Sequence, residues 1–559
     1  MSHFLQHYTL TYTPLSPIHI GTGDSYEPTN YVIDDGTLYE FDTGGALAAL
    51  TGTDRDELNR IVNRRINEDM LKAVQGFFYQ RREALKPWAI NAIPVLDGVA
   101  NLYAKRVGQT ANRESGDGQV LNKLEIDRTA YNPINRQPVL YGSSIKGAIR
   151  TALLDKVNQG RRAHERKGLH EFQGRLLQYC DPERGKLTLE QDPLRLLQLG
   201  DAVWNEAHKL PTTQVYLAVN RKKTPVLDKK GVLRQAMGEN LYQILECIPA
   251  FYANGFKGQL NIQRIEIDAP HKLPAKSLRF NITEVVAACN QFYLPQLTSE
   301  RELLQERGYG DAEWSKRLDE LLNLAQNKIR AGNAFLLRIG RHSGAEAVTV
   351  SGARNGNIKI MKGKGQPLEF ADAPKTLWLA ANDPKQRSGL LPFGWVLVEI
   401  HPGNAPVADW PELAELCQRQ QAQARQWTEK RSQEQAKLAL KRQADQQRHL
   451  QEEQERQLRQ EQEQKRLAEE EAKKAHRASL TPEQLEIEKL RETFFQKRNM
   501  KVKEQIGGPL YSGLREIIGK AASWSAEEKA ELLELAKEIL VFIDASGNKK
   551  AKELLKSLQ

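Results

Sequence analysis

Residues 418–478 constrain the fold most, because they are rich in Gln, Glu, Arg and Lys and contain almost no glycine or proline. This composition favours a helix but offers no apolar face for a core. Acidic residues precede basic ones by four positions in five favourable pairs: Glu452–Arg456, Glu455–Arg459, Glu461–Lys465, Glu469–Lys473 and Glu470–Lys474. The leucines follow no heptad, so a coiled coil is a poor fit. We predict a mostly solvated helix, about 90 Å long at roughly 1.5 Å per residue, serving as a rigid spacer or a weak oligomerisation arm.

This segment, taken as 406–478 with its approach, divides the chain. After it, residues 479–559 show the signals of a small helical module. Thr481 to Gln484 form a capping box with Pro482 at the first helical position. Ser525 to Glu528 open a second amphipathic helix.

Before the charged segment, residues 1–405 mix strands and helices. Strands are expected at 7–14, in a hairpin at 31–42 with Asp35-Gly36 as its turn, at 214–226 running into a basic tip, twice within 242–267, and at 335–350, 375–381 and 393–401. Helices are expected at 45–86 and 282–331, and a flexible loop at 105–119. The fold class is therefore α+β, in two successive units, 1–265 and 266–405.

Composition limits the classes of function. The net charge of +10 and pI near 9.1 mildly favour a polyanionic partner, but the excess is spread along the chain, so binding needs local patches. The four cysteines have long gaps and no CxxC spacing, which argues against a zinc site and a disulfide framework. We find neither a secretory signal nor a run of 18 apolar residues, and expect a cytoplasmic protein without membrane, metal or cofactor.

Three glycine turns recur in similar contexts: HIGTG (19–23), YGSSIKG (141–147) and RIGRHSG (338–344). In the second, Gly142 frees the backbone, Ser143 or Ser144 can cap, and an apolar helical pattern follows. Lys146 and Arg150 project from one face of its first turns, where the helix dipole disfavours cations. A bound anion would resolve this conflict.

Two familiar nucleotide sites do not fit these turns. In GSSIKG, Lys146 is followed by glycine and not by the Ser or Thr that would hold magnesium, so a phosphate-binding NTPase loop is disfavoured. HIGTG lacks a following helix with a third glycine, so a dinucleotide-binding fold is disfavoured too.

Taken together, the segments PIHIGTG, GSSIKGAIRTALL, ECIPAFYANGFKGQLNI, RIGRHSG and PFGWVLVEI resemble the RAMP superfamily of CRISPR proteins. The resemblance covers about residues 5–402 and is nearest to the fifth subunit of type III-A Csm effector complexes. Tyr141 stands where the family often has proline, and the bend at 247–256 is looser than the usual turn.

The resemblance implies two ferredoxin-like (RRM-like) units with helical insertions. It also implies one copy per complex, at the 3′ end of the guide RNA, stacked on a neighbouring RAMP backbone subunit. Such a subunit would cap the guide, support its 3′ maturation in antiviral defence and work beside host nucleases. Its glycine turns would lie against RNA phosphates.

Single-stranded RNA is commonly held by backbone N–H groups, cations and stacked aromatic rings, which agrees with the anion inferred above. Lys146 and Arg150 are the strongest candidates for phosphate contacts. The full set of expected RNA-binding residues is His19, Gly21, Gly23, Gly142, Ser143, Ser144, Lys146, Arg150, Arg221, Lys222, Lys223, Arg338, Gly340, Arg341 and His342.

Two other functions stay open. His19 could act as a general base toward a ribose 2′-hydroxyl in a metal-independent RAMP endoribonuclease, although no general acid is evident nearby. Alternatively, residues 418–559 could make the chain chiefly a scaffold that recruits a nuclease or a membrane-side partner. We expect no enzyme activity, with the endoribonuclease as the runner-up.

Overall fold

The computed structural model describes residues 4–63, 68–109, 113–114, 120–121, 124–162, 169–181, 186–227, 230–232, 241–269, 272–353, 358–360, 365, 367–403, 406–502 and 504–559. The fold is mixed α+β, and the chain divides into two compact units, Met1–Asp445 and Gln446–Gln559. Most of the predicted loop at 105–119 lies outside the described residues.

The first unit is built around an antiparallel sheet with strand order β15-β19-β1-β14-β11-β9, with β10 also pairing with β14. Its central strand, β1, pairs along one edge with β14 and along the other with β19. The strands are β1 (Leu5–Pro14), β9 (Val139–Leu140), β10 (Leu197–Leu199), β11 (Ala202–Trp204), β14 (Phe256–Gln263), β15 (Ala334–Arg338) and β19 (Trp395–Pro402).

A second sheet has the order β18-β12-β13-β8-β2, and among its described strands β2 lies at an edge. Its strands are β2 (Gly21–Tyr26), β8 (Ile126–Thr129), β12 (Gln214–Lys222), β13 (Tyr242–Cys247) and β18 (Thr376–Ala381). Three smaller sheets contain β3 (Tyr31–Asp34), β4 (Thr37–Glu40) and β5 (Asn91–Pro94), then β6 (Arg113–Glu114) with β7 (Val120–Leu121), and β16 (Ile358–Ile360) with β17 (Glu369–Ala371).

Each of the two large sheets takes strands from both sides of residue 265. The predicted boundary between 1–265 and 266–405 therefore does not separate two sheets. Pairing of β1 with β19 and of β12 with β18 joins segments far apart in sequence, which local patterns cannot reveal.

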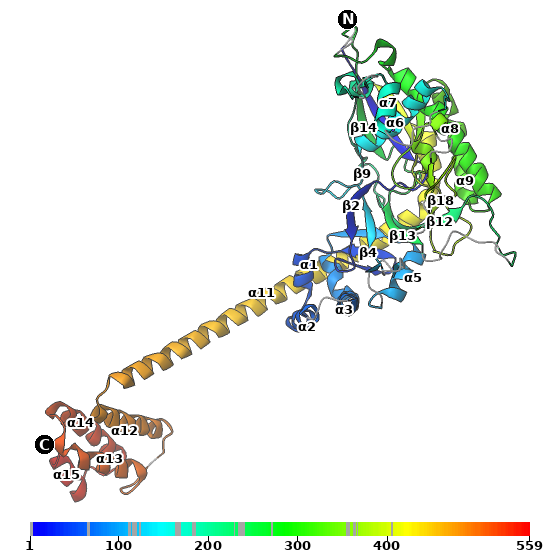
Figure 1. Cartoon of the computed structure of the whole chain (residues 1–559). Helices are drawn as coiled ribbons and strands as arrows, with labels where there is room; N and C mark the ends of the chain where they lie inside the picture. Colours follow the sequence, from blue (N-terminus) through cyan, green and yellow to red (C-terminus); the bar gives the residue numbers. More distant parts are fainter. Residues whose placement is uncertain are drawn as a thin grey trace. The chain divides into compact units, whose positions relative to one another are not determined.

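Helices α6 (Gly142–Asn158), α8 (Ile282–Glu306) and α9 (Ala312–Arg330) contact β15 of the first sheet, and α6 packs on α8 (Figure 1). They enclose one large apolar core, which includes Ile149, Phe292 and Trp395. The remaining helices of this unit are α1 (Thr43–Ala49), α2 (Gly52–Val62), α3 (Glu68–Gln80), α4 (Arg82–Leu85), α5 (Asp97–Arg106), α7 (Leu169–Leu176) and α10 (Pro411–Gln418).

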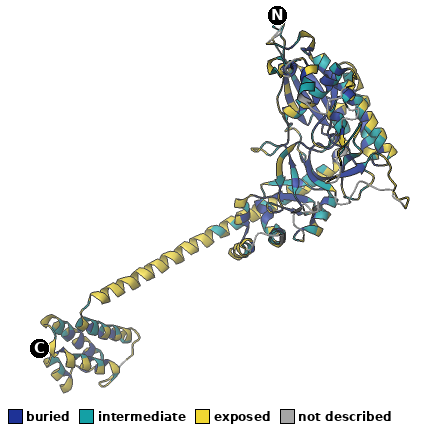
Figure 2. Ribbon diagram, viewed as in Figure 1, coloured by how far each residue is buried: buried dark blue, intermediate teal, exposed yellow. Residues whose placement is uncertain are grey.

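The predicted charged helix is α11 (Ala422–Ser479), a continuous helix of 58 residues. Its first turns are not solvated: Trp427 Nε1 donates to Thr37 Oγ1 at 3.0 Å, and Tyr39 Oη donates to Glu434. Beyond residue 450 the helix is exposed on all sides (Figure 2). The prediction of a mostly solvated helix thus missed the packed part, whose apolar contribution is made by Trp427 and Leu438.

The second unit contains α12 (Pro482–Asn499), α13 (Pro509–Lys520), α14 (Ala526–Phe542) and α15 (Lys549–Lys556). The predicted capping box at Thr481 with Gln484 is confirmed, and the predicted helix start at Ser525 is a capping box as well, completed by Glu528. The four helices enclose their own core, including Leu514. No helix in the described parts of the chain is long and apolar enough to cross a membrane.

Because this core is separate from that of the first unit, residues 480–559 should fold without the rest of the chain. We expect the isolated fragment to show a helical circular dichroism spectrum and one cooperative thermal transition. A fragment with Leu514→Ala, which removes a fully buried side chain, should lose about 2–5 kcal/mol of stability. A wild-type fragment that is unfolded in water would contradict the assignment of an independent core.

Candidate nucleic-acid interface

The first and third glycine turns meet through their backbones. Arg341 N donates to the carbonyl oxygen of His19 at 2.8 Å. Gly340 has a φ of +82°, and a Cβ at this position would overlap that same carbonyl. Only glycine combines this conformation with so close an approach. Two turns more than 300 residues apart in sequence therefore form one surface.

The side chain of His19 is fully buried beneath this surface. Its Nδ1 lies 2.8 Å from the carbonyl oxygen of Glu246, and its Nε2 has no hydrogen-bond partner among the described residues. Burial lowers the pKa of His19, so the ring is neutral at pH 7. A general base must reach the proton that it removes. In this conformation His19 positions the turn but does not present a nitrogen to an RNA.

Gly21 and Gly23, in contrast, are exposed on β2. The strand pairs with β8 through an irregular register between Gly21 and Ser25. Across the turn, the half-exposed Arg341 pairs with Asp127 of β8, with 2.5 Å between Nη1 and Oδ2. The interface therefore presents an open glycine backbone beside one guanidinium.

The second turn begins α6 in a different way from that predicted. The N-cap is Tyr141, without a side-chain cap, and Ser143 and Ser144 lie inside the helix. Gly142 N donates to Asp201 Oδ1 at 2.7 Å. The anion at the helix N-terminus is therefore the chain's own carboxylate, and the prediction of a serine cap is wrong.

The two cations of α6 differ from each other. Arg150 forms an ion pair with the carboxylate of Asp192. Lys146 is half-buried and forms no ion pair within the described parts of the chain, and burial lowers the pKa of its ammonium group. Beside it, Gly147 faces open space. Of the expected pair, Lys146 is the one left with an unpaired charge to offer a ligand.

Hydrogen bonds place α6 beside the other two turns. Ala130 N donates to the Ile20 carbonyl at 2.7 Å, and Val139 N, three residues before Gly142, donates to the Ala130 carbonyl at 2.9 Å. On the other side, Tyr293 Oη lies 3.0 Å from the carbonyl oxygen of Ala148 in α6 and 3.3 Å from that of Ala347, just after the third turn. All three glycine turns thus gather in one region of the fold.

The basic residues 221–223 do not form a hairpin tip as predicted. Arg221 is buried at the end of β12, where its guanidinium donates to the carbonyl oxygens of Pro384 and Gln386. Lys222 is half-buried, and its carbonyl accepts from Tyr309 Oη at 3.0 Å. Arg221 is committed to holding a loop and has no surface for a phosphate.

Arg338 and His342 of the third turn also point inward. Arg338 is buried and pairs with Glu300 at 2.7 Å. His342 stacks on Trp378, with ring centroids 4.7 Å apart and 21° between planes, and its Nε2 lies 2.9 Å from Gln243 Oε1. Burial lowers the pKa of His342 to about 3, so the imidazole is neutral at pH 7.

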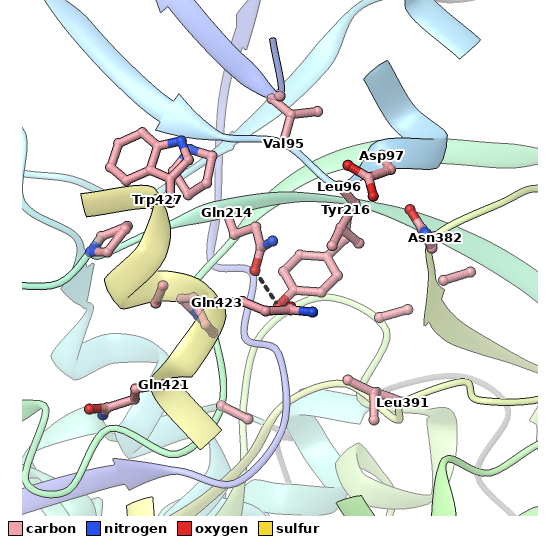
Figure 3. A pocket seen from close by; sticks show the side chains of 18 of the residues that line it. Val95, Leu96, Asp97, Gln214, Tyr216, Asn382, Leu391, Gln421, Gln423 and Trp427 are labelled. Atoms are coloured by element: carbon pink, nitrogen blue, oxygen red, sulfur yellow. Dashed lines mark hydrogen bonds between the residues drawn. The ribbon is translucent and has the colours of Figure 1, made fainter. Parts of the chain in front are cut away.

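Two pockets of the first unit differ in whether the expected RNA-binding residues line them. One, of about 460 Å³, brings Lys223, Arg338 and His342 together with Trp378. Sequence reasoning missed Trp378, although a tryptophan in the alternating strand KTLWLAA was a signal for an accessible ring. The other, of about 720 Å³, is lined by Gln214, Tyr216 and Trp427 (Figure 3). None of the expected RNA-binding residues lines this larger pocket.

Among the described residues no three His, Cys, Asp or Glu side chains come together as a metal site, and all four cysteines are buried and unpaired. Burial raises the pKa of the Cys247 thiol, which keeps it protonated at pH 7.

Replacing Gly340 by alanine should open the contact between the first and third turns. The added Cβ adopts an unfavourable positive φ and meets the His19 carbonyl, so we expect about 2–4 kcal/mol lower unfolding free energy. Gly147→Ala is the matched control: it is helical and faces open space, so it should raise stability by about 0.5–1 kcal/mol. Denaturant unfolding followed by tryptophan fluorescence measures both, and equal stability of the two variants would contradict the backbone contact.

Glu246 should make stability depend on pH. Burial raises the pKa of its carboxyl group from 4.5 to about 7, so the folded state holds the proton more tightly than the unfolded state. Its contribution is most favourable below pH 4.5 and is lost as the pH rises toward 7. Glu246→Gln keeps an acceptor for Thr129 N and a partner for Thr213 Oγ1. We expect the glutamine variant to gain stability relative to wild type between pH 4.5 and pH 8, as measured by the free energy of unfolding at each pH. Curves of this free energy against pH that run parallel for the two proteins would contradict the raised pKa.

Comparison with known proteins places the chain in a family. Two solved structures are similar: a chain of a Csm–crRNA–target RNA ternary complex of a type III-A CRISPR–Cas system (17% identity, 70% of this chain and 100% of that chain, TM-score 0.41) and T. onnurineus Csm5 (17% identity, 69% of this chain and 99% of that chain, TM-score 0.38). No curated protein matches the sequence. The sequence model of the RAMP superfamily matches residues 11–341, more than half of the chain, and includes the first two glycine turns and the start of the third. The chain belongs to the RAMP superfamily.

Proposed function

We propose that this RAMP protein is a non-catalytic, RNA-binding structural subunit of a type III CRISPR effector complex. The observation that carries the proposal is the backbone contact between the first and third glycine turns, to which hydrogen bonds through Ala130 and Val139 link the second turn. A partner that spans them meets exposed backbone at Gly21 and Gly23, the ammonium of Lys146 and the guanidinium of Arg341.

The phosphate backbone of single-stranded RNA fits this surface. Because glycine has no side chain, an RNA strand can approach its backbone closely. Cations that lie apart from one another neutralise phosphates without contacting the bases. A compact anion, such as a nucleotide triphosphate, would need several donors converging on one point. Donors that could converge on such an anion are already used inside the chain. The N-terminus of α6 donates to Asp201, and Arg150 pairs with Asp192. The exposed glycine backbone, the Lys146 ammonium and the Arg341 guanidinium remain, and these groups lie apart from one another. Such an arrangement suits an extended polyanion.

The resemblance of the glycine-turn motifs to the RAMP superfamily supports a more specific role. In this role the subunit belongs to a type III-A complex, where it caps the 3′ end of the guide RNA and supports its 3′ maturation. It stacks on a neighbouring RAMP subunit, and host nucleases are further partners. Two ferredoxin-like units would be the architectural counterpart of this role. The burial of His19 supports a structural role over cleavage by that residue.

Removal of the two dispersed cations should weaken RNA binding and its dependence on salt. We expect Lys146→Ala with Arg341→Ala to lower affinity about tenfold and to reduce the slope of log K against log salt by roughly 0.7 for each phosphate that is no longer neutralised. Lys552→Ala, an exposed lysine of α15, is the matched charge control. Filter binding of a 5′-labelled CRISPR repeat–spacer RNA between 50 and 300 mM salt, roughly the range in which phosphate contacts respond, measures both. Unchanged affinity and slope in the double variant would remove these residues from the interface.

The same RNA, incubated in EDTA and then in Mg²⁺, tests for catalysis on a denaturing gel. We expect intact RNA in both. Shortened RNA in EDTA that becomes intact with His19→Ala would replace this proposal with the metal-independent endoribonuclease. Digestion of the bound RNA by an exonuclease from the 3′ end, and by another from the 5′ end, then tests which end the protein covers. A protein that caps the 3′ end should protect that end alone.

A further inference from the structure

The pocket of about 460 Å³ is formed by four segments that the sequence separates widely. Helix α8 contributes Gln296 and Ser299, and β18 contributes Trp378. The third glycine turn and the residues after it contribute Arg338, His342 and Glu346, and Lys223 follows β12. It shares the third turn with the interface above, whose opposite side contacts His19. A strand of RNA on the glycine turns would therefore pass close to its mouth.

The charged groups that line this pocket cancel one another. Arg338 pairs with Glu300, and Lys223 pairs with Glu346. His342, the remaining titratable group of the lining, bonds Gln243 through its ring. A phosphate would have to break an ion pair to gain a cation here. The lining therefore suits a neutral ligand, in contrast to the open glycine backbone beside it.

One wall of the pocket is flat and aromatic. His342 and Trp378 stack at 4.7 Å and 21°, and Trp378 remains half-buried rather than buried. The His342 backbone has a φ of +64°, an unfavourable conformation for a non-glycine residue. Residues held in such conformations often serve binding sites, and here the conformation sets the imidazole against the indole.

The pocket also holds polar atoms that the chain does not satisfy. Gln296 Nε2 donates to the Phe292 carbonyl at 2.9 Å, while its Oε1 has no partner among the described residues. Ser299 is exposed at the pocket and its hydroxyl forms no hydrogen bond within the described parts of the chain. Gln296 Oε1 is closed off from solvent, so the polar group that this wall offers a ligand is the Ser299 hydroxyl.

We propose that this pocket receives one unstacked base of the bound RNA, with Trp378 as its stacking partner and Ser299 as its hydrogen-bonding partner. A nucleobase is flat, neutral and carries N–H donors at its edge, which matches each feature of the lining. The volume falls within the roughly 300–1,000 Å³ of small-molecule sites. The proposal rests on the RNA-binding function above, and makes one nucleotide position special in an otherwise base-independent interface.

The test combines an abasic scan of the RNA with a pocket variant of the full-length protein. A series of RNAs, each lacking the base at one position, is measured against wild type and Trp378→Leu. We expect one position, or two adjacent ones, at which removing the base weakens binding by about tenfold in wild type. In Trp378→Leu the same removal should have no effect, because the stacking partner is gone. Trp378→Phe should restore the sensitivity.

Two further variants separate the possible outcomes. Ser299→Trp fills the mouth from an exposed helical position, so it should abolish the sensitivity even if Trp378→Leu does not fold. Trp427→Leu, in the other pocket, should leave it intact. Tight RNA binding without a sensitive position would overturn the pocket and leave the proposed function standing. A sensitive position that survives in Ser299→Trp would also overturn it. Absence of RNA binding by wild type would overturn both.

Discussion

The backbone of Gly394 joins the two segments on which the rest of the interface depends. Its N–H donates to the Pro17 carbonyl at 2.9 Å, and its own carbonyl accepts from Ile339 N at 2.9 Å. Gly394 has a φ of +87°, and a side chain there would overlap the Ile339 carbonyl. The position immediately precedes β19, in which Val396 faces Pro14 of β1 and Trp395 faces Arg338 of β15. Strands β1 and β15 therefore end at the same end of the sheet, and the turns that follow them lie next to each other.

Three of the basic side chains that the sequence indicates as RNA-binding are used inside the molecule. Arg150, Arg221 and Arg338 all bond carboxylates or carbonyl oxygens of the chain itself. A buried guanidinium must be paired, since leaving it without partners costs several kcal/mol. These residues thus fix the positions of loops, and what remains for a ligand is mainly exposed backbone. This division would reconcile the modest positive charge with the polyanion-binding surface proposed above.

The sequence revealed the local features and missed the long-range ones, for a physical reason. The capping boxes at Thr481 and Ser525 depend on residues within four positions, so their patterns could be recognised directly. The boundary at residue 265 could not be judged from local patterns, because β1 pairs with β19 about 390 residues away and so joins segments on either side of it. The helix N-terminus at Gly142 was recognised, but its anion is Asp201, and only the folded chain brings the two together. The same holds for Trp378, whose role appears only beside His342.

The third turn joins two kinds of recognition within a few residues. Gly340 and Arg341 face the first turn, where the proposed contacts with RNA use backbone and charge and are independent of sequence. His342 turns the chain back through its positive φ, so that Glu346 and the imidazole line the neutral pocket instead. Phosphate contacts along a strand fix neither its register nor its end. A single base taken out of the stack would fix both, because the strand could then not slide by one nucleotide without losing a stacking partner.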